Sequence, residues 1–208
     1  RMIDFAYGAP DTLFSLTRRL GNDCEARQNG TIRAATSSRN LRDVEVIAEE
    51  CAVRGMPVEL LSREAIAQST GTAIYPGGLL DRRGGDVNPL KLVRGLEEAA
   101  RRRGVRIFGH SKATGIEKTQ GGWRVETPSG HVIADKVLLA TNGYTDGLWP
   151  GLARSIVPVF GAIAATAQLP HTLAEEIMPA RSSLYEGGRI TVYYRVDAAN
   201  RLIIGGRG

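Results

Sequence analysis

The amino-acid sequence predicts a mixed α/β fold, and three observations lead to this class. Of the 208 residues, 42% are hydrophobic and 24% are charged, which is a globular composition. Helical and strand periodicities alternate along the chain, as they do where helices and sheets pack in layers. Glycine is enriched, with 25 residues and no low-complexity repeat, which indicates many turns or close backbone approaches. A chain of this length buries about 70% of its unfolded surface, enough for a core.

Three helices are expected in the first half of the chain. Residues 10–21 show helical spacing of leucines and end at Gly21. Residues 39–55 place apolar side chains on one side, namely Leu41, Val44, Ile47, Ala48 and Cys51. Residues 62–70 begin at Ser62, a residue type that caps helix N-termini.

The segments between these helices contain turn signals. Residues 24–35 predict two short strands around Asn29–Gly30, because this dipeptide is typical of two-residue hairpins. Residues 72–86 are rich in glycine and predict a linker with a turn at residues 76–78.

The middle of the chain predicts a helix followed by strands. Residues 88–104 form a helix with Asn88 as N-cap and Gly104 as its end, and residues 105–108 follow as a strand. Three segments then predict an antiparallel meander with turns at glycines: residues 112–120, 122–130 and 131–135. Residues 136–145 predict a buried parallel strand that ends in small polar residues, where ligands bind in open α/β sheets.

The last third predicts mostly sheet. A long strand is expected over residues 155–169 and a short helix over 169–178. A hairpin follows, in which residues 192–195 pair antiparallel with residues 201–204 across the Asp-Ala-Ala-Asn loop.

Several functional classes find no support in the sequence. It contains no GxGxxG after a strand, no Walker loop, no HExxH and no GxSxG, and its three histidines lie too far apart to predict a metal site. The net charge of +5 comes from scattered arginines, so no nucleic-acid surface is predicted. The absence of an export signal and of an apolar span, with only two cysteines, favours a cytoplasmic protein.

Two stretches of the sequence resemble a known family. NPLKLVRGLEEAARRRGVRIF, continuing through KVLLATNGYTDGLWP, and YYRVDAANRLIIGGRG are similar to flavin-dependent oxidoreductases of the D-amino-acid oxidase superfamily, in the branch with γ-glutamylputrescine oxidases. The resemblance implies the interior part of an FAD-binding Rossmann-like domain plus a mostly antiparallel substrate-domain sheet with helices. It also implies FAD as cofactor and oxidation of a C–N bond in an amine or amino acid, by hydride transfer that leaves an imine for hydrolysis.

The resemblance assigns cofactor contacts by position. Ala113 matches the segment whose backbone meets the adenine of FAD, and Gly205 and Gly206 match the pair that passes the isoalloxazine ring. The end of the predicted parallel strand matches the segment near the ribose and pyrophosphate: Ala140, Thr141, Asn142 and Gly143. The alternatives are an ordinary strand-to-turn exit for that segment and a strand-end turn for the glycine pair.

Substrate contacts are expected on one strand. Tyr193 and Arg195 share one face of it, and Tyr194 takes the other. A phenol can hydrogen-bond a substrate amine or carboxylate, and a guanidinium can pair with a carboxylate. The alternatives are a packed aromatic for Tyr194 and a solvated charge for Arg195. No catalytic residue is assigned.

The sequence also departs from the family pattern, because neither the opening GxGxxG unit nor the second glycine-rich FAD segment is present. We therefore expect a central piece of an oxidase, inactive alone and binding FAD weakly at best. Its expected parts are residues 1–85 and 151–208 from the substrate domain and 86–150 from the FAD domain. The exposed edge of residues 137–139 predicts self-association. The alternative is a non-catalytic binding or interaction module.

Overall fold

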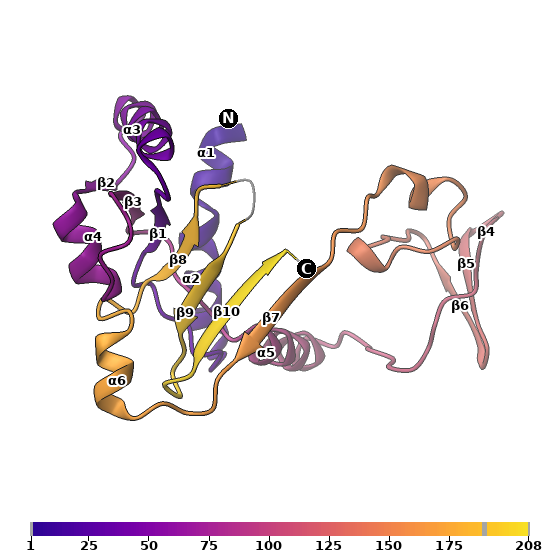
Figure 1. Ribbon diagram of the computed structural model, residues 1–208. Helices are drawn as coiled ribbons and strands as arrows, with labels where there is room; N and C mark the ends of the chain where they lie inside the picture. The colour runs from indigo at the N-terminus through magenta and orange to yellow at the C-terminus, as the bar shows by residue number, and fades with distance from the viewer. Residues whose placement is uncertain (1, 189–190, 208) are drawn as a thin grey trace. The chain divides into compact units, whose positions relative to one another are not determined.

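The computed structural model describes residues 2–188 and 191–207, and they form two compact units. The larger unit comprises Arg1–Arg103 and Gly161–Gly208, and the smaller unit comprises Gly104–Phe160 (Figure 1). The division at residues 85 and 150 that the sequence suggests concerns the domains of a longer enzyme and stays a prediction.

A mixed sheet of seven strands organises the larger unit (Figure 1). In spatial order the strands are β2 (Val58–Leu61), β3 (Gly78–Asp81), β1 (Thr31–Ala34), β8 (Ser183–Glu186), β9 (Tyr193–Val196), β10 (Leu202–Arg207) and β7 (Gly161–Ala165). Among the described strand pairs of this sheet, β1 and β8 run parallel and the others run antiparallel. The mixed α/β class with a mostly antiparallel sheet is therefore confirmed.

Six helices lie in the larger unit, counted over the described residues: α1 (Met2–Tyr7), α2 (Ala9–Leu20), α3 (Ser38–Val53), α4 (Arg63–Thr70), α5 (Pro89–Arg102) and α6 (His171–Glu176). Capping side chains fix their starts as the sequence predicts. The Ser62 side chain accepts from the amide of Ala65, and the Asn88 side chain accepts from that of Lys91.

The core lies mainly on one face of the sheet. Ile32 and Leu184 point from β1 and β8 toward Ile66 of α4 and Ala174 of α6, with Met178 beside them. All five are buried, so α4 and α6 cover this face. A second cluster packs α3 on the β2–β3 end of the sheet through Ala35, Val44 and Leu79. Both cysteines are free and buried.

The smaller unit contains the predicted meander. Strands β4 (Gly115–Thr119), β5 (Gly122–Thr127) and β6 (Gly130–Ala134) pair antiparallel in this order. Two short 3₁₀ turns follow, η1 (Asn142–Tyr144) and η2 (Leu152–Ser155). Gly122 and Gly130 both adopt positive φ at the strand starts, which confirms the predicted turn positions.

The predicted hairpin at Asn29–Gly30 is wrong. Strand β1 pairs with β3 on one edge and with β8 on the other, so neither edge is free for a strand from residues 24–28. Gly30 does take positive φ, but its amide donates to the carbonyl of Gly84 at 3.0 Å. The turn signal is local, whereas the residues that pair with β1 lie 44 or more positions away in sequence.

The linker predicted over residues 72–86 contains a strand instead. Strand β3 lies between β2 and β1, near the centre of this part of the sheet. A β-carbon at Gly78 would stand 2.8 Å from the carbonyl oxygen of Arg33 and from Cδ1 of Ile66. The glycine therefore serves close packing against a neighbouring strand and helix rather than chain flexibility.

Two predicted strands do not form, the one over residues 105–108 and the parallel strand over residues 136–145. Residues 105–108 and 136–139 belong to none of the strands, and Leu138 is 89% exposed rather than buried. A parallel strand needs neighbours on its edges, and no strand among the described residues supplies them. The strand predicted over residues 155–169 also shortens to β7.

The C-terminal hairpin is confirmed, with Tyr194 opposite Ile204 and Val196 opposite Leu202. Asp197 holds its loop, since Oδ1 accepts from the amides of Ala199 and Arg201 at 2.9 Å and the side chain is paired with Arg201. Burial of Asp197 acts to raise the pKa of this carboxyl, but these donors outweigh burial and lower it.

We expect Asp197→Asn to lower the free energy of unfolding at neutral pH by about 1–2 kcal/mol. Because the carboxyl has a lowered pKa in the folded state, its contribution is present above its unfolded pKa of about 3.9 and fades as the pH falls through the folded value. Urea unfolding at neutral pH and at about pH 3 checks this, since the difference between variant and parent should shrink in acid. A difference that is independent of pH would contradict it.

Candidate cofactor and substrate site

One transverse row of residues crosses five strands of the large sheet. Arg33 on β1 is opposite Tyr185 on β8, which is opposite Tyr193 on β9. Tyr193 is opposite Gly205 on β10, which is opposite Ile163 on β7. Because paired residues project to the same side of a sheet, these five form one stripe, called here the Arg33–Ile163 row. It lies on the face opposite to the α4–α6 core.

Within this row, the ring of Tyr193 lies over Gly205. A β-carbon at Gly205 would stand 2.5 Å from Cζ of Tyr193 and 2.6 Å from its hydroxyl oxygen. The absence of a side chain at Gly205 therefore makes room for the tyrosine ring, which stays 36% exposed. At Gly206 a β-carbon would make only an ordinary 3.5 Å contact with the carbonyl of Thr191. The contact of either glycine with flavin stays a prediction.

The glycine pair supplies a matched test of this packing. We expect Gly205→Ala to lower the free energy of unfolding by about 1–3 kcal/mol, because the tyrosine ring must move. Gly206→Ala is expected to change it by less than about 0.5 kcal/mol. Thermal unfolding of both variants checks the difference, and equal losses would show that Gly205 is not reserved for the ring.

Tyr194 points to the opposite face and joins a buried polar group. Its hydroxyl lies 3.2 Å from that of Tyr75, and Tyr75 donates to Oε1 of Glu186 at 2.9 Å. Burial raises the pKa of both tyrosines, so both phenols are neutral at physiological pH. Tyr75 was not predicted as a partner of Tyr194, because the glycine-rich pattern around it predicts a linker.

Arg195 belongs to a cluster built on Asp86. This carboxylate is paired with both Arg195 and Arg27, and its side chain is only 6% exposed. Arg195 also donates to the carbonyl of Val87, and Arg27 donates to that of Val196 at 2.7 Å. The cluster therefore ties β9 to the segment before α5, and the Arg195 guanidinium is held by protein partners.

The predicted nucleotide segment lies in the smaller unit. Ala140, Thr141, Asn142 and Gly143 are all exposed, and Asn142 takes a φ of 45°. A β-carbon at Gly143 would meet nothing within 4 Å. Ala113 lines a groove of about 660 Å³ together with Phe108 and Ile133. The open backbone of residues 140–143 fits a segment that approaches phosphate oxygens.

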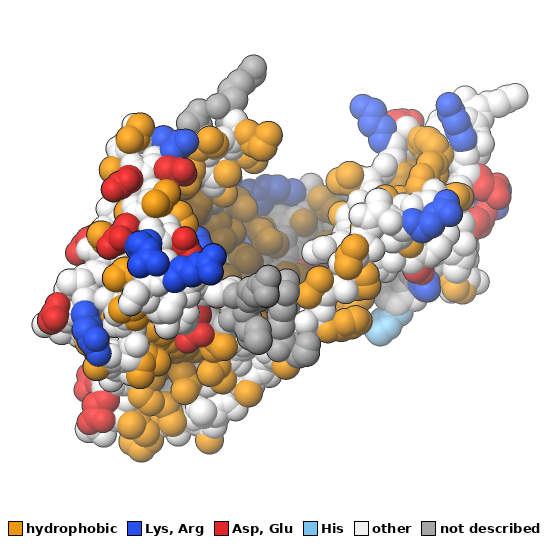
Figure 2. Space-filling view, turned by 45° about the horizontal axis from the view of Figure 1, so that its top comes forward, with side chains coloured by type: hydrophobic (Ala, Val, Ile, Leu, Met, Phe, Trp, Pro, Cys, Tyr) orange, Lys and Arg blue, Asp and Glu red, His pale blue; other side chains and the backbone are white. Residues whose placement is uncertain are grey.

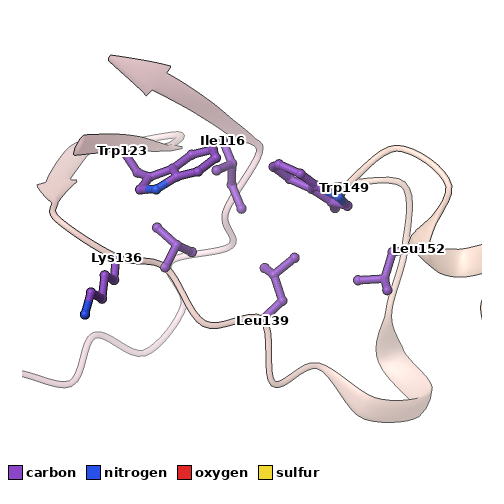
Figure 3. Close-up of a pocket in the computed structure, with 7 residues that line it drawn as sticks. Ile116, Trp123, Lys136, Leu139, Trp149 and Leu152 are labelled. Carbon is purple, nitrogen blue, oxygen red and sulfur yellow. The ribbon is translucent and has the colours of Figure 1, made fainter. Parts of the chain in front are cut away.

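A second cavity of about 620 Å³ in the smaller unit is mostly apolar (Figure 3). The rings of Trp123 and Trp149 stand edge to face across it, with centroids 5.8 Å apart. Leu139 points toward the rings, whereas the ammonium group of Lys136 extends away from them (Figure 3). The cavity offers an apolar surface without convergent polar groups.

The described residues were also searched for metal sites, membrane-spanning helices and basic surface patches. Among residues 2–188 and 191–207, no three His, Cys, Asp or Glu side chains gather where they could hold a metal ion. In the same residues no helix is long and apolar enough to cross a membrane. Figure 2 shows basic and acidic side chains intermixed on the visible face rather than a single basic patch.

Solved structures share this arrangement. The glycine oxidase of Geobacillus kaustophilus superposes with a TM-score of 0.74 at 19% identity, over 96% of this chain and 52% of that one. The L-proline dehydrogenase of P. horikoshii superposes with a TM-score of 0.76 at 14% identity, over 97% of this chain and 54% of that one. These likenesses show that the chain shares the fold of these two enzymes.

Sequence comparison identifies the family. Residues 1–208 match the family model described as FAD dependent oxidoreductase, DAO, and the chain belongs to this family. The gamma-glutamylputrescine oxidoreductase of Escherichia coli is 32% identical over 191 residues, 91% of this chain and 44% of that protein. The probable oxidoreductase OrdL of Rhizobium meliloti is 34% identical over 150 residues, 72% and 35% respectively. The chain thus spans less than half the length of these relatives.

Proposed function

We propose that residues 1–208 form part of an enzyme that oxidises a C–N bond of an amine or amino acid with FAD as cofactor. The observation that carries this proposal is the match of the whole chain to the FAD-dependent family, with a gamma-glutamylputrescine oxidoreductase similar over 91% of it. The activity is proposed for the whole enzyme in which these residues occur.

The residues of the chain fit a supporting role around the cofactor. When bound, FAD would supply the two-electron oxidation of the C–N bond, with a hydride leaving the substrate carbon that carries nitrogen and an imine left for hydrolysis by water. We assign the backbone of the half-buried Ala113 and of the exposed residues 140–143 to the nucleotide part of FAD. Gly205 and Gly206 are assigned to the isoalloxazine ring on the strength of the family resemblance, and contact at Gly205 requires the ring of Tyr193, which lies over it, to share that face.

On the substrate side, we assign direct contact to Tyr193 and positioning to its two neighbours. Tyr193 is half-exposed on the same row as Gly205, so its phenol can meet a ligand beside the flavin. Tyr194 is anchored through Tyr75, and Arg195 through Asp86. These anchors fix strand β9 from both faces and thereby fix the orientation of Tyr193.

Anaerobic flavin reduction tests the proposal. The intact enzyme, loaded with FAD, is mixed with a panel of amines and amino acids and, separately, with polyol phosphates. The latter are included because an L-alpha-glycerophosphate oxidase shares the fold, with a TM-score of 0.59 and 17% identity. We expect bleaching of the visible flavin absorption by nitrogen compounds only. Reduction by alcohols alone would overturn the proposed C–N chemistry.

A further inference from the structure

An ion pair joins the two stretches of the smaller unit that we assign to the nucleotide part of FAD. Nζ of Lys112, the residue before Ala113, lies 3.0 Å from Oδ2 of Asp146, which follows Gly143 by three positions. Both charged residues line a cavity of about 310 Å³ together with Ala113. The pair therefore connects the two stretches at a place where both border the same space.

The stretch that carries Lys112 is fixed to the antiparallel meander. The amide of Thr114 donates to the carbonyl of Glu126 on β5 at 2.8 Å, which continues the pairing of β4 with β5 beyond the first residue of β4. Lys112 lies only two positions before this bond. Its backbone therefore has a defined place at the end of the sheet.

The stretch that carries Asp146 is a turn held by its own hydrogen bonds. The hydroxyl of Thr145 lies 2.7 Å from that of Thr141 and donates to the carbonyl of Asn142 at 2.7 Å. Oδ1 of Asp146 accepts from the amide of Leu148 at 3.0 Å, which leaves Oδ2 for the ion pair. These bonds shape the turn, but they do not attach it to the meander.

Two side-chain contacts give the turn its attachment to the meander. One is the edge-to-face contact of Trp149 with Trp123 on β5, which borders the apolar cavity (Figure 3). The other is the ion pair of Lys112 with Asp146, which lies next to Ala113. The ion pair is thus the attachment nearer to the stretch assigned to the cofactor.

The charges of this ion pair balance one another. The hydrogen bond from the Lys112 ammonium, with that from the Leu148 amide, lowers the pKa of the Asp146 carboxyl. The carboxyl is therefore ionised at neutral pH and neutralises the ammonium. A lysine that is occupied in this way is suited to hold two backbone stretches together rather than to bind a phosphate itself.

We infer that the ion pair of Lys112 with Asp146 is a clamp that sets the spacing of the two backbone stretches meeting the nucleotide part of FAD. Both are positioning residues, because they act through the backbone of Ala113 and of residues 140–143. The inference rests on the proposed function, since it needs FAD bound at these stretches. It does not depend on which substrate the enzyme oxidises.

Equilibrium binding of FAD tests the clamp without any substrate. The intact enzyme, freed of its flavin, is titrated with FAD, and the change in flavin fluorescence gives Kd for the parent, Lys112→Met, Asp146→Asn and the double variant. We expect each single variant to raise Kd about two- to fivefold, the range for a solvent-exposed ion pair. The double variant should lose no more than the weaker-binding single variant, because both changes remove the same contact.

The meander supplies matched controls. Lys118 and Glu117 are exposed charged residues on β4, and Lys118→Met and Glu117→Gln should leave Kd unchanged. Lys112→Arg keeps a cation at the clamp and should bind FAD like the parent. These variants separate loss of the clamp from a general change in surface charge.

Competition with parts of the cofactor tests which portion of FAD depends on the clamp. ADP, which corresponds to the nucleotide part, should lose affinity by the same factor as FAD in Lys112→Met and Asp146→Asn. Riboflavin, which lacks that part, should bind both variants as it binds the parent. A loss confined to riboflavin would overturn the clamp.

The outcomes separate the clamp from its alternatives and from the proposed function. Weaker binding of FAD by Lys112→Met with tighter binding by Asp146→Asn would show that Lys112 binds a phosphate directly, and would overturn the clamp. Unchanged Kd in both variants, or losses that add in the double variant, would overturn it too. If Kd changes as expected but no nitrogen compound reduces the flavin, the proposed C–N chemistry fails and the clamp stands.

Discussion

Replacing Asp86 with alanine is expected to lower the free energy of unfolding by about 3–5 kcal/mol. Two arginines share this one carboxylate, whose side chain is 6% exposed. Its removal leaves both guanidinium groups, each about one-fifth exposed, next to one another without a counter-ion. Urea unfolding at neutral pH measures the loss.

A surface ion pair gives the matched control for Asp86. Glu59 pairs with Arg82, and both side chains are about half exposed or more. Because solvent screens such pairs, Glu59→Gln should change the free energy of unfolding by less than about 1 kcal/mol. A double variant, Asp86→Leu with Arg195→Met, should recover part of the loss, since the burial of one unpaired charge is removed. Equal effects of Asp86→Ala and Glu59→Gln would show that burial does not strengthen the Asp86 cluster.

The Asp86 cluster also bears on the proposed function. Strand β9 carries Tyr193, and its Arg195 is held by Asp86 while its Val196 carbonyl accepts from Arg27. Loss of the cluster is therefore expected to disturb the substrate side before the whole unit unfolds. The guanidinium that the sequence suggested as a ligand contact thus holds the strand in place.

Local signals predicted the elements that depend on neighbouring residues. Asn88 caps α5, Ser62 caps α4, and the loop after Val196 turns on Asp197, all through bonds to residues two to four positions away. The meander β4–β5–β6 also formed where glycines separate alternating segments. In each case the physical cause lies within a few residues of the element that it shapes.

Strand pairing and site contacts could not be predicted in this way. Tyr75 and Glu186 are 111 residues apart, and Arg195 and Asp86 are 109 apart, so no local pattern connects them. Arg33 stands alone between apolar residues of a short strand, a pattern that equally fits a solvated charge. The residues that surround Arg33 depend on which strand lies beside β1, and the pairing of β1 with β8 joins residues about 150 positions apart.

Gly71→Ala is expected to lower the free energy of unfolding by about 3 kcal/mol or more, through backbone strain and overpacking together. Gly71 ends α4 with a φ of 75°. A β-carbon there would stand 3.1 Å from the carbonyl carbon of Glu176 and closer still to its oxygen, which is backbone and cannot rotate away. The amide of Met178 donates to the carbonyl of Thr70 at 3.1 Å, so the end of α6 is fixed against the end of α4.

Gly21→Ala is the control that distinguishes backbone strain at positive φ from steric crowding by the added β-carbon. It also ends a helix, α2, with a similar φ of 62°, but a β-carbon there would meet nothing within 4 Å. Gly21→Ala should therefore cost only about 1 kcal/mol, the penalty of the left-handed conformation itself. Thermal and urea unfolding of both variants give the comparison. Equal losses for the two variants would contradict the prediction, because the contact between α4 and the end of α6 would then adjust without a loss of stability. The core around Ile66 and Met178 would in that case be less tightly packed than their complete burial indicates.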